Sequence, residues 1–157
     1  MKNASASCSD TTFSGTGPMP PKAETDTSYA IVWSVKNSSN PVANAVVSTV
    51  LPTYVRYVSA GAAGVSYDGG SRTVSWNLGD LPAGVGYTSA AKQATFQVIL
   101  TPSTSQVGSV PQLTGPTQLS GQDRFAQVNV QTSSPALTTQ LSGDPGFNNN
   151  MSVVAPK

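Results

Sequence analysis

Alternation of apolar and polar side chains is the feature that most restricts how this chain can fold. In one segment Tyr29, Ile31, Trp33 and Val35 alternate with Ser28, Ala30, Ser34 and Lys36, and Val32 is the one bulky apolar exception. Successive side chains of a β-strand point to opposite faces, so this period of two predicts a half-buried strand. The same period recurs in residues 45–51, 73–78 and 93–101, and no window sustains the period of a helix.

Shorter strands are predicted at 55–59, 65–67, 112–121 and 125–131, with a last edge strand at 136–141. In the 125–131 strand, we expect Ala126, Val128 and Val130 to face the core. Asp68-Gly69-Gly70 predicts a hairpin turn with positive φ, and residues 79–84 predict a corner. Short strands spaced by about 8–12 residues, with turn signals between them, are typical of an all-β, antiparallel two-sheet sandwich.

The inward-facing positions of these strands predict the hydrophobic core. Trp33 and Trp76 both lie on the inward register, which favours core packing over a platform for stacking carbohydrate. The side chains expected between the sheets are Tyr29, Ile31, Trp33, Val47, Leu51, Val74, Trp76, Leu78, Phe96, Val98 and Leu100.

The chain has 157 residues, enough for one domain with a real core but not for two. Residues 1–22 are rich in Ser, Thr, Gly and Pro, and they predict an irregular arm or linker that docks on this domain or on a neighbour. Residues 23–157 are expected to form a single β-sandwich domain. Its turn-rich tail, Gly143 to Asn150, is expected to be exposed.

Charged residues make up only 10% of the chain and the net charge is +1, which makes nucleic acid and membrane surfaces poor partners. The 22 Ser and 17 Thr supply a hydroxyl-rich surface that suits extracellular strands. No segment approaches the roughly 20 apolar residues of a membrane span, so no direct membrane insertion is expected. The first residues lack the apolar core of a signal peptide, so in an exported protein that signal has been removed.

Residues with catalytic or metal-binding chemistry are scarce. The absence of histidine removes Ser-His and Cys-His pairs and every His-containing metal site. Cys8 is expected to be an ordinary exposed thiol. The carboxylates fall mostly at turns, so we expect no enzyme, metal or cofactor. Calcium binding by loop carboxylates and an isopeptide bond from Lys22 or Lys36 to Asn129 are less favoured alternatives.

Four segments carry a resemblance to a known family: residues 29–37 (YAIVWSVKN), 44–52 (NAVVSTVLP), 57–59 (YVS) and 74–84 (VSWNLGDLPAG). They resemble the bacterial and archaeal surface-repeat family called domain of unknown function eleven. The region after residue 101, with Asp144-Pro145-Gly146-Phe147, resembles the C-terminal module of large candidate-phylum bacterial surface proteins. The resemblance implies an immunoglobulin-like sandwich that acts as an extracellular spacer or adhesive module, and it brings no catalytic residues.

Two functions from different classes fit these observations. The first is a non-catalytic structural module of an exported cell-surface or filament protein. It would associate with itself or with neighbouring domains of the same protein, through strand exchange at an open sheet edge. The alternative is an adhesin that recognises a glycan or a protein through loops at one end, with Tyr54, Tyr87 and Phe147 as exposed aromatic residues.

Overall fold

The computed structural model describes residues 4–7, 12–141 and 146–157. In this part of the chain, β-strands build two antiparallel sheets, and the helical segments are two short 3-10 helices, Thr104–Gln106 and Asn149–Ser152. The strands are β1 (Ala4–Ser7), β2 (Thr27–Val35), β3 (Val42–Val50), β4 (Val55–Ala60), β5 (Val65–Asp68), β6 (Thr73–Leu81), β7 (Lys92–Leu100), β8 (Thr117–Asp123) and β9 (Asn129–Ser134).

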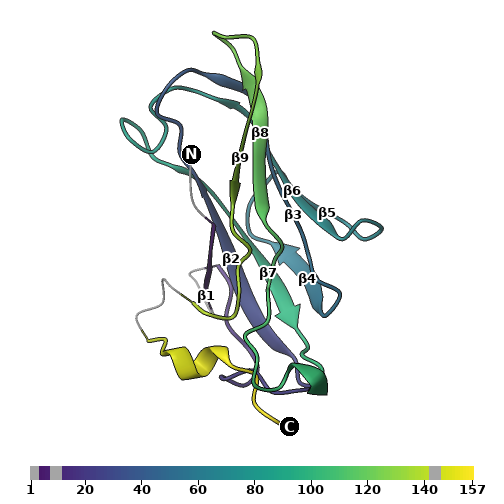
Figure 1. Cartoon of the computed structure of the whole chain (residues 1–157). Coiled ribbons are helices and arrows are strands. Elements are labelled where there is room, and N and C mark those ends of the chain that lie inside the picture. Colours follow the sequence, from purple (N-terminus) through teal and green to yellow (C-terminus); the bar gives the residue numbers. More distant parts are fainter. Residues whose placement is uncertain (1–3, 8–11, 142–145) are drawn as a thin grey trace.

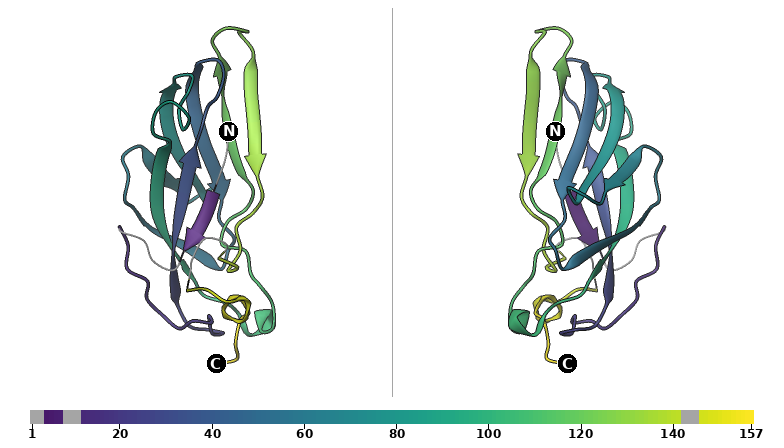
Figure 2. Two further views of the ribbon diagram at one scale, coloured as in Figure 1. Left: turned by 90° about the vertical axis from the view of Figure 1, so that its left-hand side faces the viewer. Right: turned by 90° about the vertical axis from the view of Figure 1, so that its right-hand side faces the viewer.

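The sheets stack as the two layers of an elongated sandwich (Figures 1 and 2). One has the strand order β1-β2-β7-β4 and the other β5-β6-β3-β8-β9. Immunoglobulin constant domains have the orders A-B-E-D and C-F-G. Here β1, β2, β7 and β4 take the A, B, E and D places, and β3, β8 and β9 the C, F and G places, with the β5–β6 hairpin added beside β3. The predicted immunoglobulin-like, antiparallel sandwich is confirmed.

The core lies between β2 and β7 of one sheet and β3 and β6 of the other. Trp33 lies 6.5 Å from Trp76, ring centroid to centroid and nearly parallel, and meets Phe96 edge-on at 4.9 Å. Aromatic pairs favour both arrangements. All of the predicted core side chains are buried except Leu78, which is half-buried and packed against the others. The alternation seen in the sequence therefore produces one dry layer between the sheets.

Both terminal regions pack onto the sandwich. β1 pairs antiparallel with β2, from Ala4 opposite Trp33 to Ser7 opposite Ala30. Towards the other terminus, Ala155 exchanges backbone hydrogen bonds with Pro21 and Ala23. Of the predicted tail, residues 146 and 148–150 are exposed whereas Phe147 is half-buried, and residues 143–145 lie outside the described part.

Several local predictions are wrong. The edge strand predicted at 136–141 does not form, and Thr138 makes an isolated bridge with Gln112 instead. Ala126 and Val128 are exposed, because they belong to the turn between β8 and β9, and only Val130 packs against the core. The turn between β5 and β6 takes its positive φ at Arg72 (57°) rather than at the glycines. Residues 79–81 continue β6, ending in the fully buried Leu81, so the corner begins later than predicted.

The 3-10 helices are too short to cross a membrane, and the described part of the chain contains no longer helix.

Candidate functional site

The three aromatic residues predicted to bind a ligand do not meet. Tyr54 precedes β4 at the end of the sandwich where β2 begins and β7 ends, and its carbonyl accepts a hydrogen bond from the Thr101 N–H. Phe147 lies near the same end, and both side chains are partly buried against the core. Tyr87 is 65% exposed and belongs to the loop between β6 and β7, at the opposite end. A single binding site built from all three is therefore excluded.

A pocket of about 430 Å³ opens beside Tyr54. Its wall includes Tyr57 and Tyr67, whose rings stack at 4.8 Å, and partial burial raises the pKa of the Tyr57 phenol. Arg72 closes one side. Its guanidinium donates to the carbonyls of Leu51, Pro52 and Val55, which ties the β5–β6 turn to the β3–β4 loop. These bonds occupy the arginine in holding the two loops together.

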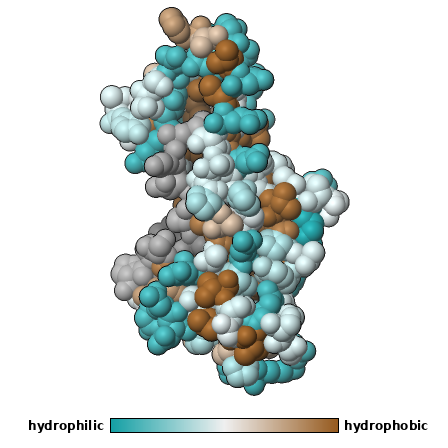
Figure 3. Space-filling view, viewed as in Figure 1, coloured by the Kyte–Doolittle hydropathy of each residue, from teal (hydrophilic) through white to brown (hydrophobic). Residues whose placement is uncertain are grey.

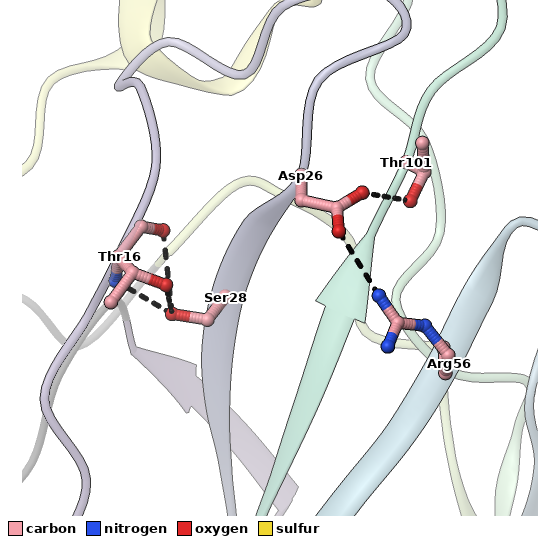
Figure 4. Close-up of polar contacts among 5 residues, drawn as sticks. All are labelled: Thr16, Asp26, Ser28, Arg56 and Thr101. Carbon is pink, nitrogen blue, oxygen red and sulfur yellow. Dashed lines mark hydrogen bonds and ion pairs between the residues drawn. The ribbon is translucent and has the colours of Figure 1, made fainter.

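A second polar cluster fixes the approach of the N-terminal segment to β2 (Figure 4). The N–H of Thr16 donates to the Ser28 hydroxyl at 2.7 Å, and the Ser28 N–H donates to the Thr16 carbonyl at 2.9 Å. Nearby, the carboxylate of Asp26, just before β2, accepts from Thr101, just after β7, at 2.6 Å and from Arg56 of β4 at 3.0 Å. This cluster joins segments distant in sequence, and its ion pair is exposed, so its role is structural.

The turn between β8 and β9 is organised around Asp123. One carboxylate oxygen accepts the N–H groups of Phe125 (2.8 Å) and Ala126 (2.9 Å), and the other accepts from the Asn40 amide (3.0 Å). These bonds hold the pKa of Asp123 below its usual value, the Ala126 N–H having the largest effect and the Asn40 amide the next. The turn presents the Phe125 side chain to solvent, 85% exposed.

Sequence reasoning did not single out this exposed Phe125, because it assigned the residue to a strand at 125–131, whereas the structure places it in the turn between β8 and β9. One signal was present: Asp123 begins the five residues DRFAQ, and an aspartate side chain that accepts the next backbone N–H groups is a turn signature. The β8–β9 hairpin extends past the neighbouring strands (Figure 2).

Apart from these features, the surface drawn in Figure 3 shows apolar residues in small, separate patches. Among the described residues, no three carboxylate or thiol side chains gather where they could hold a metal ion. Cys8 lies outside the described residues. Lys22, at the end where β2 begins, and Asn129, at the opposite end, are both exposed.

Open sheet edges are the remaining candidates for a functional surface. β1 and β4 border the four-stranded sheet, and β5 and β9 border the five-stranded one. Edge strands present unpaired N–H and C=O groups that can template another strand. In this chain the edge of β2 already accepts a short strand, β1, from the N-terminal segment.

Comparisons with known proteins add only distant similarity. No family model matches the chain, and no curated protein matches it. Among solved structures, a variant of the major pilin subunit BcpA of Bacillus cereus is 13% identical, with a TM-score of 0.48 over 76% of this chain and 36% of that one. Two domains of the major pilin SpaD of Corynebacterium diphtheriae are 6% identical, with a TM-score of 0.43 over 75% of this chain and 47% of that one.

A protein of the DUF4466 family from Parabacteroides merdae is 10% identical, with a TM-score of 0.28 over 86% of this chain and 44% of that one. This chain thus spans less than half the length of these three structures. With identities this low, the matches assign no role to any residue here.

Proposed function

We propose that this chain is a non-catalytic structural module of an exported cell-surface or filament protein, which associates with copies of itself or with neighbouring domains by strand exchange. The observation that carries the proposal is the pairing of β1 with β2. β1 is only four residues long and closes an edge of the four-stranded sheet. A short terminal strand that completes its own sheet can complete the same edge of a second copy, which is the basis of strand exchange.

The surface chemistry supports an extracellular location for this module. Hydroxyl and amide groups provide most of its polarity, and charged residues are only 10% of the chain. The absence of histidine from the sequence supports a module without acid-base chemistry. Membership in the surface-repeat family stays a prediction from the four sequence segments.

Deleting residues 1–11 tests the exchange. It removes β1 but keeps Thr16, whose bonds to Ser28 anchor the rest of the N-terminal segment. The matched control deletes residues 1–3 and leaves β1 in place. We expect negative-stain images and sedimentation of the parent and the control to show larger assemblies than the longer deletion forms, with the same far-ultraviolet spectrum in all three proteins. Unchanged assembly after the longer deletion contradicts strand exchange.

A binding module is the second candidate, and the exposure of Tyr87 favours it. This side chain is 65% exposed on a loop, where sandwich domains often carry recognition residues. A glycan array with the parent and with a Tyr87→Ala variant tests the idea. Signals lost in the variant support it, whereas an array without signals for the parent, together with no captured protein ligand, removes it.

A further inference from the structure

The free edge of β9 stands apart from the other sheet edges. β9 pairs with β8 over six consecutive residue pairs, from Ser134 opposite Thr117 to Asn129 opposite Gln122, without a register shift. Within the described chain, the backbone of residues 129–134 has no hydrogen-bond partner outside β8. A regular strand of this length therefore presents an unpaired row of backbone groups to solvent.

Proteins usually protect such edges with charge, proline, irregularity or short length. β4 has Arg56 on the edge and a register shift between Tyr57 and Ser59. β1 and β5 are only four residues long. β9, with the sequence NVQTSS, has no charge, proline or shift. Of the edges described, it is the one best suited to accept another strand.

We propose that β9 pairs antiparallel with β9 of a second copy of this chain, about a two-fold axis perpendicular to the sheet. The two five-stranded sheets would then join into one continuous sheet. Directly opposite residues of an antiparallel pair project to the same face. The two-fold axis therefore places residues of equal parity opposite each other. We place the axis near the middle of β9, which puts Gln131 against the partner's Gln131 and Asn129 against the partner's Ser133.

The side chains of β9 suit this self-pairing. Val130, Thr132 and Ser134 face the same side as the buried Leu119 and Thr117, their neighbours on β8. The alternate residues Asn129, Gln131 and Ser133 lie on the outer face with other uncharged amides. Amides and hydroxyls can donate to and accept from their own kind, so identical strands meet without like-charge repulsion.

Apolar side chains beyond β9 extend the same interface. In this register Val128, which is 52% exposed, lies opposite the partner's Ser134. The partner's chain then continues through its exposed Pro135, towards the hairpin turn that presents Phe125. Asp123 fixes that turn before association, which reduces the entropy lost on binding. The most exposed large apolar side chain of the described surface, Phe125, thus lies at the border of this interface.

A charge swap at Gln131 tests this interface, because the two-fold axis places both copies of this exposed residue together. Sedimentation of the full-length protein should show concentration-dependent association through β9 between micromolar and millimolar concentration, and the protein lacking residues 1–11 should show this monomer–dimer step alone. Gln131→Lys and Gln131→Glu should each raise the dimer Kd about tenfold or more, because like charges then oppose each other. An equal mixture of the two variants should recover dimers.

The control is Gln93→Lys, which changes an exposed glutamine of β7 in the other sheet and should leave the Kd unchanged. Thermal midpoints establish that each variant folds. A parent that stays monomeric, variants with the parental Kd, or a mixture without recovery would each overturn the proposal. This interface does not use β1, so the protein lacking residues 1–11 should dimerise equally well. A failure of strand exchange and a failure of this interface are thereby distinguished.

Discussion

The buried indole of Trp33 combines an unfavourable contribution to stability, an unsatisfied N–H group, with a favourable one, the packing of its ring. Its N–H is buried and has no hydrogen-bond partner among the described residues. Leaving such a donor unsatisfied costs about 1–3 kcal/mol. The ring nevertheless contacts Trp76 and Phe96, and burying a large aromatic side chain is worth more than this cost, since Trp→Ala substitutions in cores lose about 3–5 kcal/mol. Packing of the ring outweighs the unsatisfied donor.

Asp123 gives a prediction about pH. Its pKa is lowered in the folded state, so its carboxylate stabilises the β8–β9 turn above the unfolded pKa of about 3.9. That contribution is lost as the pH falls through the lower, folded pKa. In an NMR titration, the Phe125 and Ala126 amide signals should shift with a midpoint below the usual aspartate value.

An Asn40→Ala variant provides the control for this titration. It removes the amide that donates to Asp123, so the midpoint should move up towards the usual value. A parental midpoint at or above the usual value would show that the turn is not organised by this carboxylate. A midpoint unaffected by the variant would show that the Asn40 amide does not help to lower the pKa of Asp123.

The strands themselves were largely predictable from sequence, because β6, β7 and the second half of β2 each bury mainly one face and therefore alternate in hydropathy. The turns were less predictable. The β8–β9 turn contains Ala126 and Val128, whose apolar character resembles that of a strand, and it uses a left-handed Gln127 (φ 57°). Arg72 takes a similar conformation because its guanidinium bonds hold the turn in place. Long-range contacts of this kind leave no local sequence signal.

The same limit applies to the candidate sites. The aromatic residues predicted to bind a ligand were selected because of their side-chain type. The end of the sandwich at which a loop lies depends instead on how the strands cross between the two sheets. Tyr54 and Tyr87 therefore fell at opposite ends. An open sheet edge was part of the sequence-based prediction. To identify β9 as the unprotected edge, the order of the strands in the sheet must be known, and the structure supplies that order.

Gly17 gives a prediction about the docking of the N-terminal segment. Its φ is +93°, and a Cβ added there would lie 2.2 Å from the Asp26 carbonyl oxygen. Gly17→Ala should therefore lower the free energy of unfolding by more than about 1 kcal/mol. Gly69→Ala is the matched control, since its Cβ would meet only Tyr67, at 3.9 Å. Urea denaturation measures both, and equal stabilities would contradict close packing of the segment against β2.

The molecule combines a closed interior with edges of unequal protection. Its interior is filled by aromatic and aliphatic side chains, and its described carboxylates are engaged in turns and exposed ion pairs. Association through backbone pairing needs no charged or catalytic residue, so it suits a chain in which 10% of the residues are charged. The β1 exchange and the β9 pairing use different sheets, so together they would link copies in two directions.

Hydrogen–deuterium exchange at low and high protein concentration tests association through sheet edges most directly, because it reports each backbone N–H group. We expect slower exchange at high concentration for amides of residues 129–134 and no change in the β4 edge, which Arg56 and the register shift protect. The contradicting result is a protein that associates while exchange in β9 stays independent of concentration and new protection is confined to the end loops.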